Sequence, residues 1–215
     1  MRSRRRETDD SRPANGLPLG IMDRELLRNA SRVIGVDEVG RGALAGPVVV
    51  CAASFATIPD DSGIQDSKRL SPKRRREAVS RLLTSDAHWV VCEIWEEVID
   101  RVNILESTRL AMRAAAIALV DPSVVVVTDH VDPGDLCCPV LSPKSADRDY
   151  FCVAAASIFA KVHRDRIMVD LGSKHPHWEW QNNKGYGTQA HRRALQMHGS
   201  TVFHRRTFHW SPVLP

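Results

Sequence analysis

Residues 32–55 read RVIGVDEVGRGALAGPVVVCAASF, a sequence that predicts two neighbouring strands of a buried sheet. It opens with a β-branched, apolar run at 32–37 that ends in carboxylates, and it closes with a second buried run at 46–55. Short apolar runs bounded by glycines are typical of strands in a covered sheet. The connection through Gly40-Arg41-Gly42 is short, so we expect the two strands to pair antiparallel.

Downstream of this pair, apolar runs alternate with helical patterns. Further strands are predicted at 88–95, 123–128 and around 139–141, and the run SVVVVT at 123–128 is typical of the centre of a sheet covered on both faces. Helical sequence is predicted at 23–30, 72–83, 96–119, about 149–171 and 188–198, with Asp23, Ser71 and Thr188 as N-caps and Gly199 as a terminator. The order predicts an α/β domain with a mixed central sheet flanked by helices and a helical C-terminal part.

The chain has 215 residues, 43% of them hydrophobic and 26% charged, as expected for a globular protein with one main core. We predict a mobile basic arm with a possible short helix at 1–30, the α/β domain at 31–209 and a tail at 210–215. No apolar run approaches the roughly 20 residues that cross a bilayer. The basic N-terminus lacks the apolar stretch of a secretory signal, so we expect a cytoplasmic protein that does not bind membranes.

Five cysteines show no CxxC spacing, and three of them lie in apolar runs. Cys137 and Cys138 have His130 nearby, which suggests zinc. Adjacent residues rarely share one tetrahedral site, however. Reduced structural thiols are the preferred interpretation.

The C-terminal segment carries charge of one sign, because no acidic residue follows Glu179. Its basic and aromatic members include Lys184, Tyr186, His191, Arg192, Arg193, His198, Phe203, His204, Arg205, Arg206, Phe208, His209 and Trp210. A basic segment with interleaved aromatic residues favours contact with nucleic-acid phosphates. A solvated basic helix and tail is the alternative.

Carboxylates stand at the ends of two predicted strands. Asp37 closes the first strand, and Asp129 closes the strand at 123–128. Acids gathered at one edge of a sheet repel one another unless a cation lies between them, and Mg²⁺ and Mn²⁺ prefer oxygen ligands. The alternative is that each acid merely caps a turn.

The segment GVDEVGRGALAGPVVV at 35–50 strongly resembles the N-terminal signature of type 2 ribonuclease H (ribonuclease HII), in which a strand runs into Asp-Glu, Gly-Arg-Gly and Gly-Pro. Further motifs follow in the order that this family shows: DSKRLS at 66–71, NIL at 103–105, TD at 128–129, AASIFAK at 155–161, RD at 164–165, KGYGT at 184–188 and HRRTF at 204–208. The resemblance covers residues from about 33 to 208, nearly the whole chain.

This resemblance implies a ribonuclease H-like fold and a metal-dependent endoribonuclease. The family cleaves the RNA strand of RNA–DNA hybrids and nicks at single ribonucleotides in duplex DNA, leaving 3′-hydroxyl and 5′-phosphate ends. Two divalent ions, Mg²⁺ or Mn²⁺, are implied, with Asp37 bridging them and Asp129 and Asp147 each on one side. Glu38 belongs to the same set. Because neighbours on a regular strand point to opposite faces, Glu38 could act through its backbone carbonyl or through water.

The resemblance also assigns substrate contacts. The loop Gly40-Arg41-Gly42 would read the 2′-hydroxyl at the RNA–DNA junction, because glycines allow a ribose to approach the backbone closely. Tyr186 would stack on the sugar of the DNA side, the alternative being a packed loop residue. Candidate phosphate contacts are Lys68, Ser157 and Lys161. The last two are four apart on one helix and can face one groove, although Lys161 could equally be a surface lysine. Arg205 and Arg206 are expected to stabilise the fold or to contact a backbone phosphate of the nucleic acid, and not to take part in the chemistry.

The sequence departs from the family pattern at two places. His130 stands where the family usually has glycine, and the segment from Lys144 to Asp147 has one residue more than the usual Lys-x-Asp. Asp149 is therefore a rival to Asp147 as the fourth acid. Two other functions stay open: a weakened hybrid-binding protein, and another nuclease of the same fold. A monomer is expected.

Overall fold

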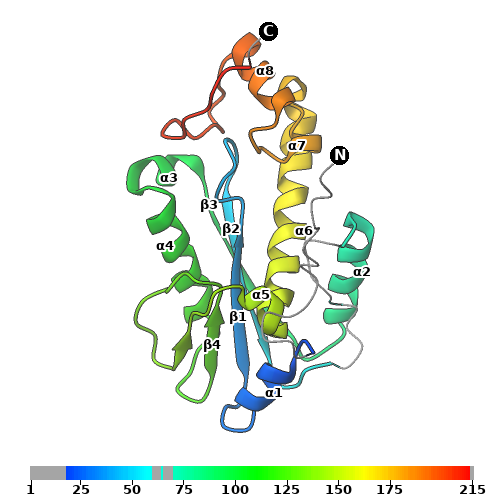
Figure 1. The fold of residues 1–215 in the computed structure, drawn as a ribbon, viewed down its shortest axis with the longest axis vertical. Helices are drawn as coiled ribbons and strands as arrows, with labels where there is room; N and C mark the ends of the chain where they lie inside the picture. The colour runs from blue at the N-terminus through cyan, green and yellow to red at the C-terminus, as the bar shows by residue number, and fades with distance from the viewer. Residues whose placement is uncertain (1–17, 60–63, 65–69, 214–215) are drawn as a thin grey trace, which may run out of the picture.

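The computed structural model describes residues 18–59, 64 and 70–213 (Figure 1). The predicted phosphate contact Lys68, residues 1–17 of the predicted arm and the last two residues of the tail lie outside the described residues. The strands are β1 (Val33–Val39), β2 (Val48–Phe55), β3 (His88–Ile94), β4 (Val125–Thr128) and β5 (Val140–Leu141). The helices are α1 (Ile21–Leu26), α2 (Pro72–Leu82), α3 (Glu96–Val102), α4 (Ile104–Ile117), α5 (Ala146–Asp149), α6 (Phe151–Lys174), η1 (Pro176–Trp178), α7 (Trp180–Asn183) and α8 (Gln189–His198).

The five strands form one mixed sheet in the order β3-β2-β1-β4-β5. β1 pairs antiparallel with β2, as the short connection predicts, and Asp37 lies opposite Cys51. β1 pairs parallel with β4, and β4 with β5. The apolar run at 123–128 supplies β4, an inner strand between β1 and β5, as expected for a strand covered on both faces; β1 occupies the middle of the sheet.

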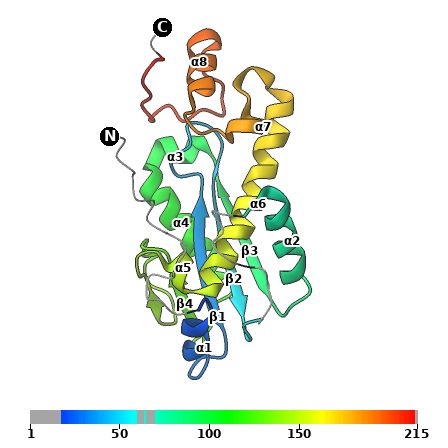
Figure 2. The same ribbon diagram turned by 45° about the vertical axis from the view of Figure 1, so that its right-hand side comes forward.

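Helices cover both faces of the sheet. α3 and α4 lie on one side, and α6 with α2 beyond it on the other (Figures 1 and 2). Residues alternate along β1, so Ile34 and Val36 join the cluster around α4 while Val33 joins the cluster around α6. A Cβ atom on Gly35 would lie 2.0 Å from the backbone carbon of Cys152. β1 and α6 therefore touch backbone to backbone, which fixes the central strand against the longest helix.

The predicted helical sequence at 96–119 divides at Asn103. This residue has a left-handed φ of 72°, and its Oδ1 accepts hydrogen bonds from the backbone N–H groups of Leu105 and Glu106. This positive φ interrupts the helix, and Asn is a preferred N-cap, so Asn103 ends α3 and starts α4. Ser71 and Thr188 cap α2 and α8 as predicted.

The predicted role of Asp23 as the cap of its own helix is wrong. The N-cap of α1 is Gly20, and Asp23 is fully buried inside that helix. Its carboxylate accepts hydrogen bonds from the N–H groups of Phe151, at 2.7 Å, and Cys152, at 2.9 Å. Asp23 therefore caps the first turn of α6, where unpaired N–H groups and the positive end of the helix dipole favour a carboxylate.

The described part of the predicted arm packs on the domain. Side chains at 19, 22, 26 and 27 contact the core cluster around α6. α1 lies at one end of the molecule, and α7 and α8 lie at the other, beyond the connection between β1 and β2 (Figures 1 and 2).

The C-terminal segment is more buried than its composition predicts. His191, His204 and Arg205 have 0%, 4% and 2% of their surface exposed, so these three do not form the predicted phosphate-binding surface. The rings of His191 and His204 pack against Trp180, which belongs to a separate core cluster with Met168. All five cysteines are unpaired, and Cys51 and Cys152 are buried in the core, as expected for structural thiols. Among the described helices, none has the length and apolarity to cross a bilayer.

Candidate active site

Four acids line one open pocket of about 490 Å³. They are Asp37, Glu38, Asp129 and Asp147, which come from the end of β1, the residue after β4 and the short helix α5. β1 and β4 are parallel neighbours, so their carboxyl ends meet at the same edge of the sheet. The fold thus brings together the whole set of acids that the sequence nominates.

Asp37 is the most perturbed acid of the four. It is 8% exposed, and its pKa is raised well above the usual value, first by burial and then by the charges of Glu38 and Asp129. A hydrogen bond from Ser157 opposes this shift. Asp37 points to the α6 face of the sheet, where the serine lies one turn before Lys161. A carboxylate in this setting is costly unless a cation compensates its charge.

Glu38 contributes its side chain to the pocket even though it follows Asp37 on a strand. Its Oε1 accepts a hydrogen bond of 3.1 Å from Arg41, whereas its Oε2 is buried and has no hydrogen-bond partner among the described residues. Burial raises the pKa of Glu38, and the charge of Asp129 raises it further, against the opposing effect of Arg41. A buried carboxylate oxygen without a donor is a position suited to a cation or a bound water.

Asp129 and α5 are linked directly. Asp129 Oδ1 accepts a hydrogen bond of 3.1 Å from the backbone N–H of Ala146, the first residue of α5. Asp147 follows in that helix, is 6% exposed and lines the pocket, whereas Asp149 is not among the lining residues. The helix predicted to start near 149 starts at Phe151, so α5 is a separate turn that presents Asp147.

The loop Gly40-Arg41-Gly42 also lines the pocket. Gly40 has a left-handed φ of 92°, and a Cβ atom there would lie 2.2 Å from Arg164 Nε, so the fold itself requires this glycine. A Cβ atom on Gly42 would meet nothing within 4 Å. Arg205 donates hydrogen bonds to the carbonyls of Arg41, at 2.8 Å, and Gly46, and burial lowers its pKa to about 9. Arg205 therefore holds the loop, as expected.

Tyr186 lies at the pocket beside this loop. It forms an isolated β-bridge with Ala43, and the guanidinium carbon of Arg164 lies 5.3 Å from its ring centroid. The buried Arg164 also donates to the carbonyls of Pro47, at 2.8 Å, and Lys184, at 2.8 Å. One arginine thus joins the loop and the tyrosine segment, which were separate motifs in the sequence.

Of the predicted phosphate contacts, Ser157 and Lys161 both line the pocket from α6. Lys161 donates a 2.7 Å hydrogen bond to Asp165. Arg75, on α2, lines the pocket too and was not nominated from the sequence. It stands in a run of three arginines, and helical periodicity could have marked it only if the packing of α2 against α6 were known.

A family model described as Ribonuclease HII matches residues 34–211. The chain belongs to the ribonuclease HII family. Ribonuclease HII of Paracoccus denitrificans is 45% identical over 189 residues, which cover 87% of this chain and 90% of that protein. The one from Ruegeria pomeroyi is 43% identical, over 82% and 76% of the two chains. This ribonuclease HII is accordingly a metal-dependent endoribonuclease that acts on RNA–DNA hybrids.

Solved structures support the predicted ribonuclease H-like fold. The ribonuclease H2 from Pyrococcus horikoshii OT3 aligns with a TM-score of 0.67 at 28% identity, over 82% of this chain and 93% of that chain. Bst-RNase HIII in complex with Mn²⁺ gives a TM-score of 0.67 over 89% and 71% of the chains, and its 22% identity shows the shared fold alone.

The departures from the ribonuclease HII pattern fall where the backbone is left-handed. His130 has a φ of 63°, which explains why glycine suits this position, and Ser145, in the lengthened segment, has a φ of 59°. Each non-glycine residue in this region costs about 1 kcal/mol. Both residues flank acids of the pocket, so the local strain is borne by the loops that present Asp129 and Asp147.

The pocket of this ribonuclease HII fits divalent cations. Burial and the negative charges of neighbouring acids raise the pKa values of Asp37 and Glu38, and Glu38 Oε2 has no hydrogen-bond donor among the described residues. Within the described part of the chain, no three His, Cys, Asp or Glu side chains are gathered closely enough to hold one ion by themselves. Carboxylate oxygens are the ligands that divalent cations such as Mg²⁺ and Mn²⁺ prefer, and water and substrate phosphate can complete their coordination.

Proposed function

We propose that this ribonuclease HII nicks duplex DNA at a single embedded ribonucleotide, in addition to cleaving RNA–DNA hybrids. In the reaction, a water oxygen forms a bond to phosphorus, and the bond from phosphorus to the 3′ oxygen breaks. The products are a 3′-hydroxyl end, which takes up a proton, and a 5′-phosphate end. Two bound divalent ions would activate the water and stabilise the leaving oxygen.

Asp37, Glu38, Asp129 and Asp147 would hold these ions. The observation that carries this proposal is that all four line one pocket together with the Gly40-Arg41-Gly42 loop and Tyr186. Acids alone would repel a phosphate. A set of acids that can bind metal ions, placed beside a segment that can contact a ribose, is suited to hydrolysing the phosphodiester bond next to a single ribonucleotide.

Recognition of the ribose would fall to Gly42 and Tyr186. Neither packing nor backbone conformation requires glycine at 42, because its φ is ordinary and the space beside it is open. A sugar could approach the backbone there and offer its 2′-hydroxyl to peptide groups. Tyr186 would then stack on the neighbouring deoxyribose. Through backbone carbonyls, Arg164 ties Lys184 to residues 45–47, and Arg205 ties Arg41 to the same segment.

The deciding experiment compares three duplexes of one sequence: all DNA, DNA with one ribonucleotide, and an RNA–DNA hybrid, each with Mg²⁺ or Mn²⁺. We expect cleavage of the second and third, with no cut in all-DNA duplex, and with ends that a DNA ligase or polymerase assay identifies as 5′-phosphate and 3′-hydroxyl. Asp37→Asn should reduce cleavage by at least about 1,000-fold, which corresponds to about 4 kcal/mol of transition-state free energy.

Other outcomes select other functions. Cutting that needs no ribonucleotide would indicate another nuclease of this fold. Binding of hybrid without cleavage in either metal would indicate a weakened hybrid-binding protein. Tyr186→Ala should lower the preference for the embedded ribonucleotide over the hybrid by about tenfold; an unchanged preference would contradict the stacking role.

A further inference from the structure

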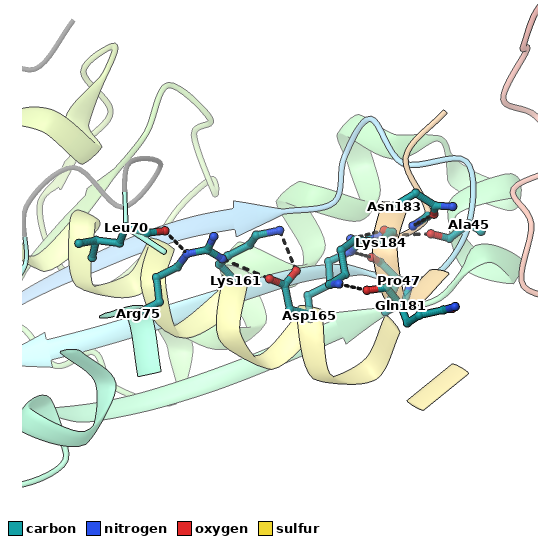
Figure 3. Close-up of polar contacts among 11 residues, drawn as sticks. Ala45, Pro47, Leu70, Arg75, Lys161, Asp165, Gln181, Asn183 and Lys184 are labelled. Carbon is teal, nitrogen blue, oxygen red and sulfur yellow. Dashed lines mark hydrogen bonds and ion pairs between the residues drawn. The ribbon is translucent and has the colours of Figure 1, made fainter. Parts of the chain in front are cut away.

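Basic side chains surround a single acid at the pocket rim. Asp165 on α6 accepts a hydrogen bond of 2.7 Å from Lys161 Nζ through Oδ1, and one of 3.2 Å from Arg75 Nη1 through Oδ2 (Figure 3). Lys161 and Arg75 line the pocket, whereas Asp165 is not among the lining residues. One carboxylate thus holds two cations that come from different helices and face the same space.

Positive charge is in excess at this place. Arg164 and Lys184 lie close enough to influence the same group of charges: burial lowers the pKa of Lys184, Asp165 raises it, and Lys161, Arg75 and Arg164 lower it again. Two cations therefore hydrogen-bond to Asp165, and two more lie near enough to be influenced by its charge. A salt bridge whose only purpose was to join α2 to α6 would need one cation, and the surplus charge is suited to an anionic ligand.

The guanidinium of Arg75 is fixed on two sides and has donors left over. Its Nε donates to the carbonyl of Leu70, at 3.0 Å, and its Nη1 to Asp165, at 3.2 Å (Figure 3). Its Nη2 makes no hydrogen bond to any described residue. The side chain is only 13% exposed, so little of its rotamer freedom remains to be lost on binding. A held arginine with spare N–H groups is a preorganised phosphate ligand.

We propose that Arg75 binds a backbone phosphate of the nucleic acid, and that Asp165 is a positioning residue that holds Arg75 and Lys161 for this contact. The inference rests on the proposed function only in placing the duplex at the pocket of the four acids. Arg75 supplies affinity and register without reading the sequence of the strand, as phosphate contacts do. Asp165 lowers the cost of keeping two cations side by side before the substrate arrives.

The test measures the dissociation constant of a labelled RNA–DNA hybrid in EDTA between about 50 and 200 mM KCl. Arg75→Ala should weaken binding by about tenfold at the lower salt, and should reduce the slope of log affinity against log salt by about one. Arg75→Lys should retain the slope. Arg74→Ala and Arg76→Ala are matched controls, because these exposed residues of α2 carry the same charge; each should change the slope by less than half as much.

The role of Asp165 is tested by a double-mutant cycle. In an Asp165→Asn background, the effect of Arg75→Ala on affinity should shrink to that of Arg74→Ala, because a guanidinium that is no longer held loses its advantage over its neighbours. An undiminished effect would contradict the positioning role.

A purely structural ion pair has its own signature. Arg75→Ala would then lower the midpoint of thermal unfolding and leave the salt slope equal to that of the controls, which would overturn the proposal. The assay is independent of cleavage at a single ribonucleotide. A slope that depends on Arg75 in a protein that does not nick at one ribonucleotide would therefore refute the proposed function and uphold this inference.

Discussion

His191 and His204 share a hydrogen bond of 3.1 Å between their Nε2 atoms. The other bonds of the pair fix which nitrogen carries each proton. His204 Nδ1 accepts from the backbone N–H of Thr201, so its Nε2 carries hydrogen and donates to His191 Nε2. That nitrogen also accepts from Trp180 Nε1, which leaves His191 Nδ1–H to donate to the carbonyl of Tyr186, 3.0 Å away. Both rings must therefore be neutral.

Acid should destabilise this arrangement. Burial, with the neighbouring His191, lowers the pKa of His204 from 6.5 to about 4. Above pH 6.5 the ring is neutral in both the folded and the unfolded chain, and the bonds contribute fully. Below that pH the unfolded chain takes up a proton first, so stability falls between about pH 6.5 and pH 4, by up to about 3 kcal/mol.

Urea unfolding across this pH range checks the prediction. His204→Gln should flatten the dependence relative to the wild type, and His198→Gln, at an exposed position, should leave it unchanged. Equal slopes in wild type and His204→Gln would show that other groups cause the acid sensitivity.

Asp147 and Asp149 should differ sharply in their effect on cleavage. Asp147 lines the pocket and Asp149 does not. Asp147→Asn should lower kcat/KM for hybrid by at least about 100-fold, or about 2.7 kcal/mol, and Asp149→Asn by less than about threefold. Single-turnover cleavage of one labelled hybrid measures both. The reverse ranking would make Asp149 the fourth acid.

Substitutions at the two glycines of the loop should have different effects. One should lower the stability of the fold, and the other should weaken recognition of the ribose. Gly40→Ala introduces a left-handed alanine that collides with Arg164, so it should lower the free energy of unfolding by about 2 kcal/mol or more. Gly42→Ala has room and should change stability by less than about 0.5 kcal/mol, while reducing nicking at a single ribonucleotide by about tenfold. Full nicking activity in Gly42→Ala would show that no sugar packs there.

Asp23 should stabilise the domain by capping α6, a helix that is far from it in the sequence. Asp23→Ala removes two hydrogen bonds to a carboxylate and leaves the N–H groups of Phe151 and Cys152 without these acceptors, at a cost of about 2 kcal/mol. Glu25→Ala, on the exposed side of α1, is the control and should cost less than about 0.5 kcal/mol. Chemical unfolding at neutral pH measures both. A loss that is equal in the two variants would mean that capping contributes nothing.

The sequence could predict features that rest on local pattern. The apolar runs gave the strands, Ser71 and Thr188 marked helix starts, and Asp37 and Asp129 stood at strand ends that parallel pairing brings to one edge. Ordered motifs then supplied most of the other pocket residues, with Arg75 as an exception. The first kind of signal depends only on a few residues that are neighbours in the sequence. The second depends on motifs that the members of one family share.

Features that depend on distant contacts were missed or misassigned. Asp23 looked like an ordinary N-cap because its actual partners are 128 and 129 positions away. Arg75 could not be told from Arg74 and Arg76 until α2 was docked on α6. His204 and Arg205 read as surface charges, but their polar atoms meet partners inside the fold. Composition measures how polar a segment is, and tertiary contacts decide whether it is buried.

The bond between Asp23 and α6 also bears on the order in which the protein can assemble. A chain emerging from the ribosome makes Asp23 long before its partners at 151 and 152 exist. Until then the carboxylate has no helix to cap, and the N-terminal segment lacks its hydrogen bonds and its packing against α6. We therefore expect nascent fragments that end before Phe151 to leave 18–30 open to protease, and docking of this segment to be a late folding event that follows formation of the longest helix.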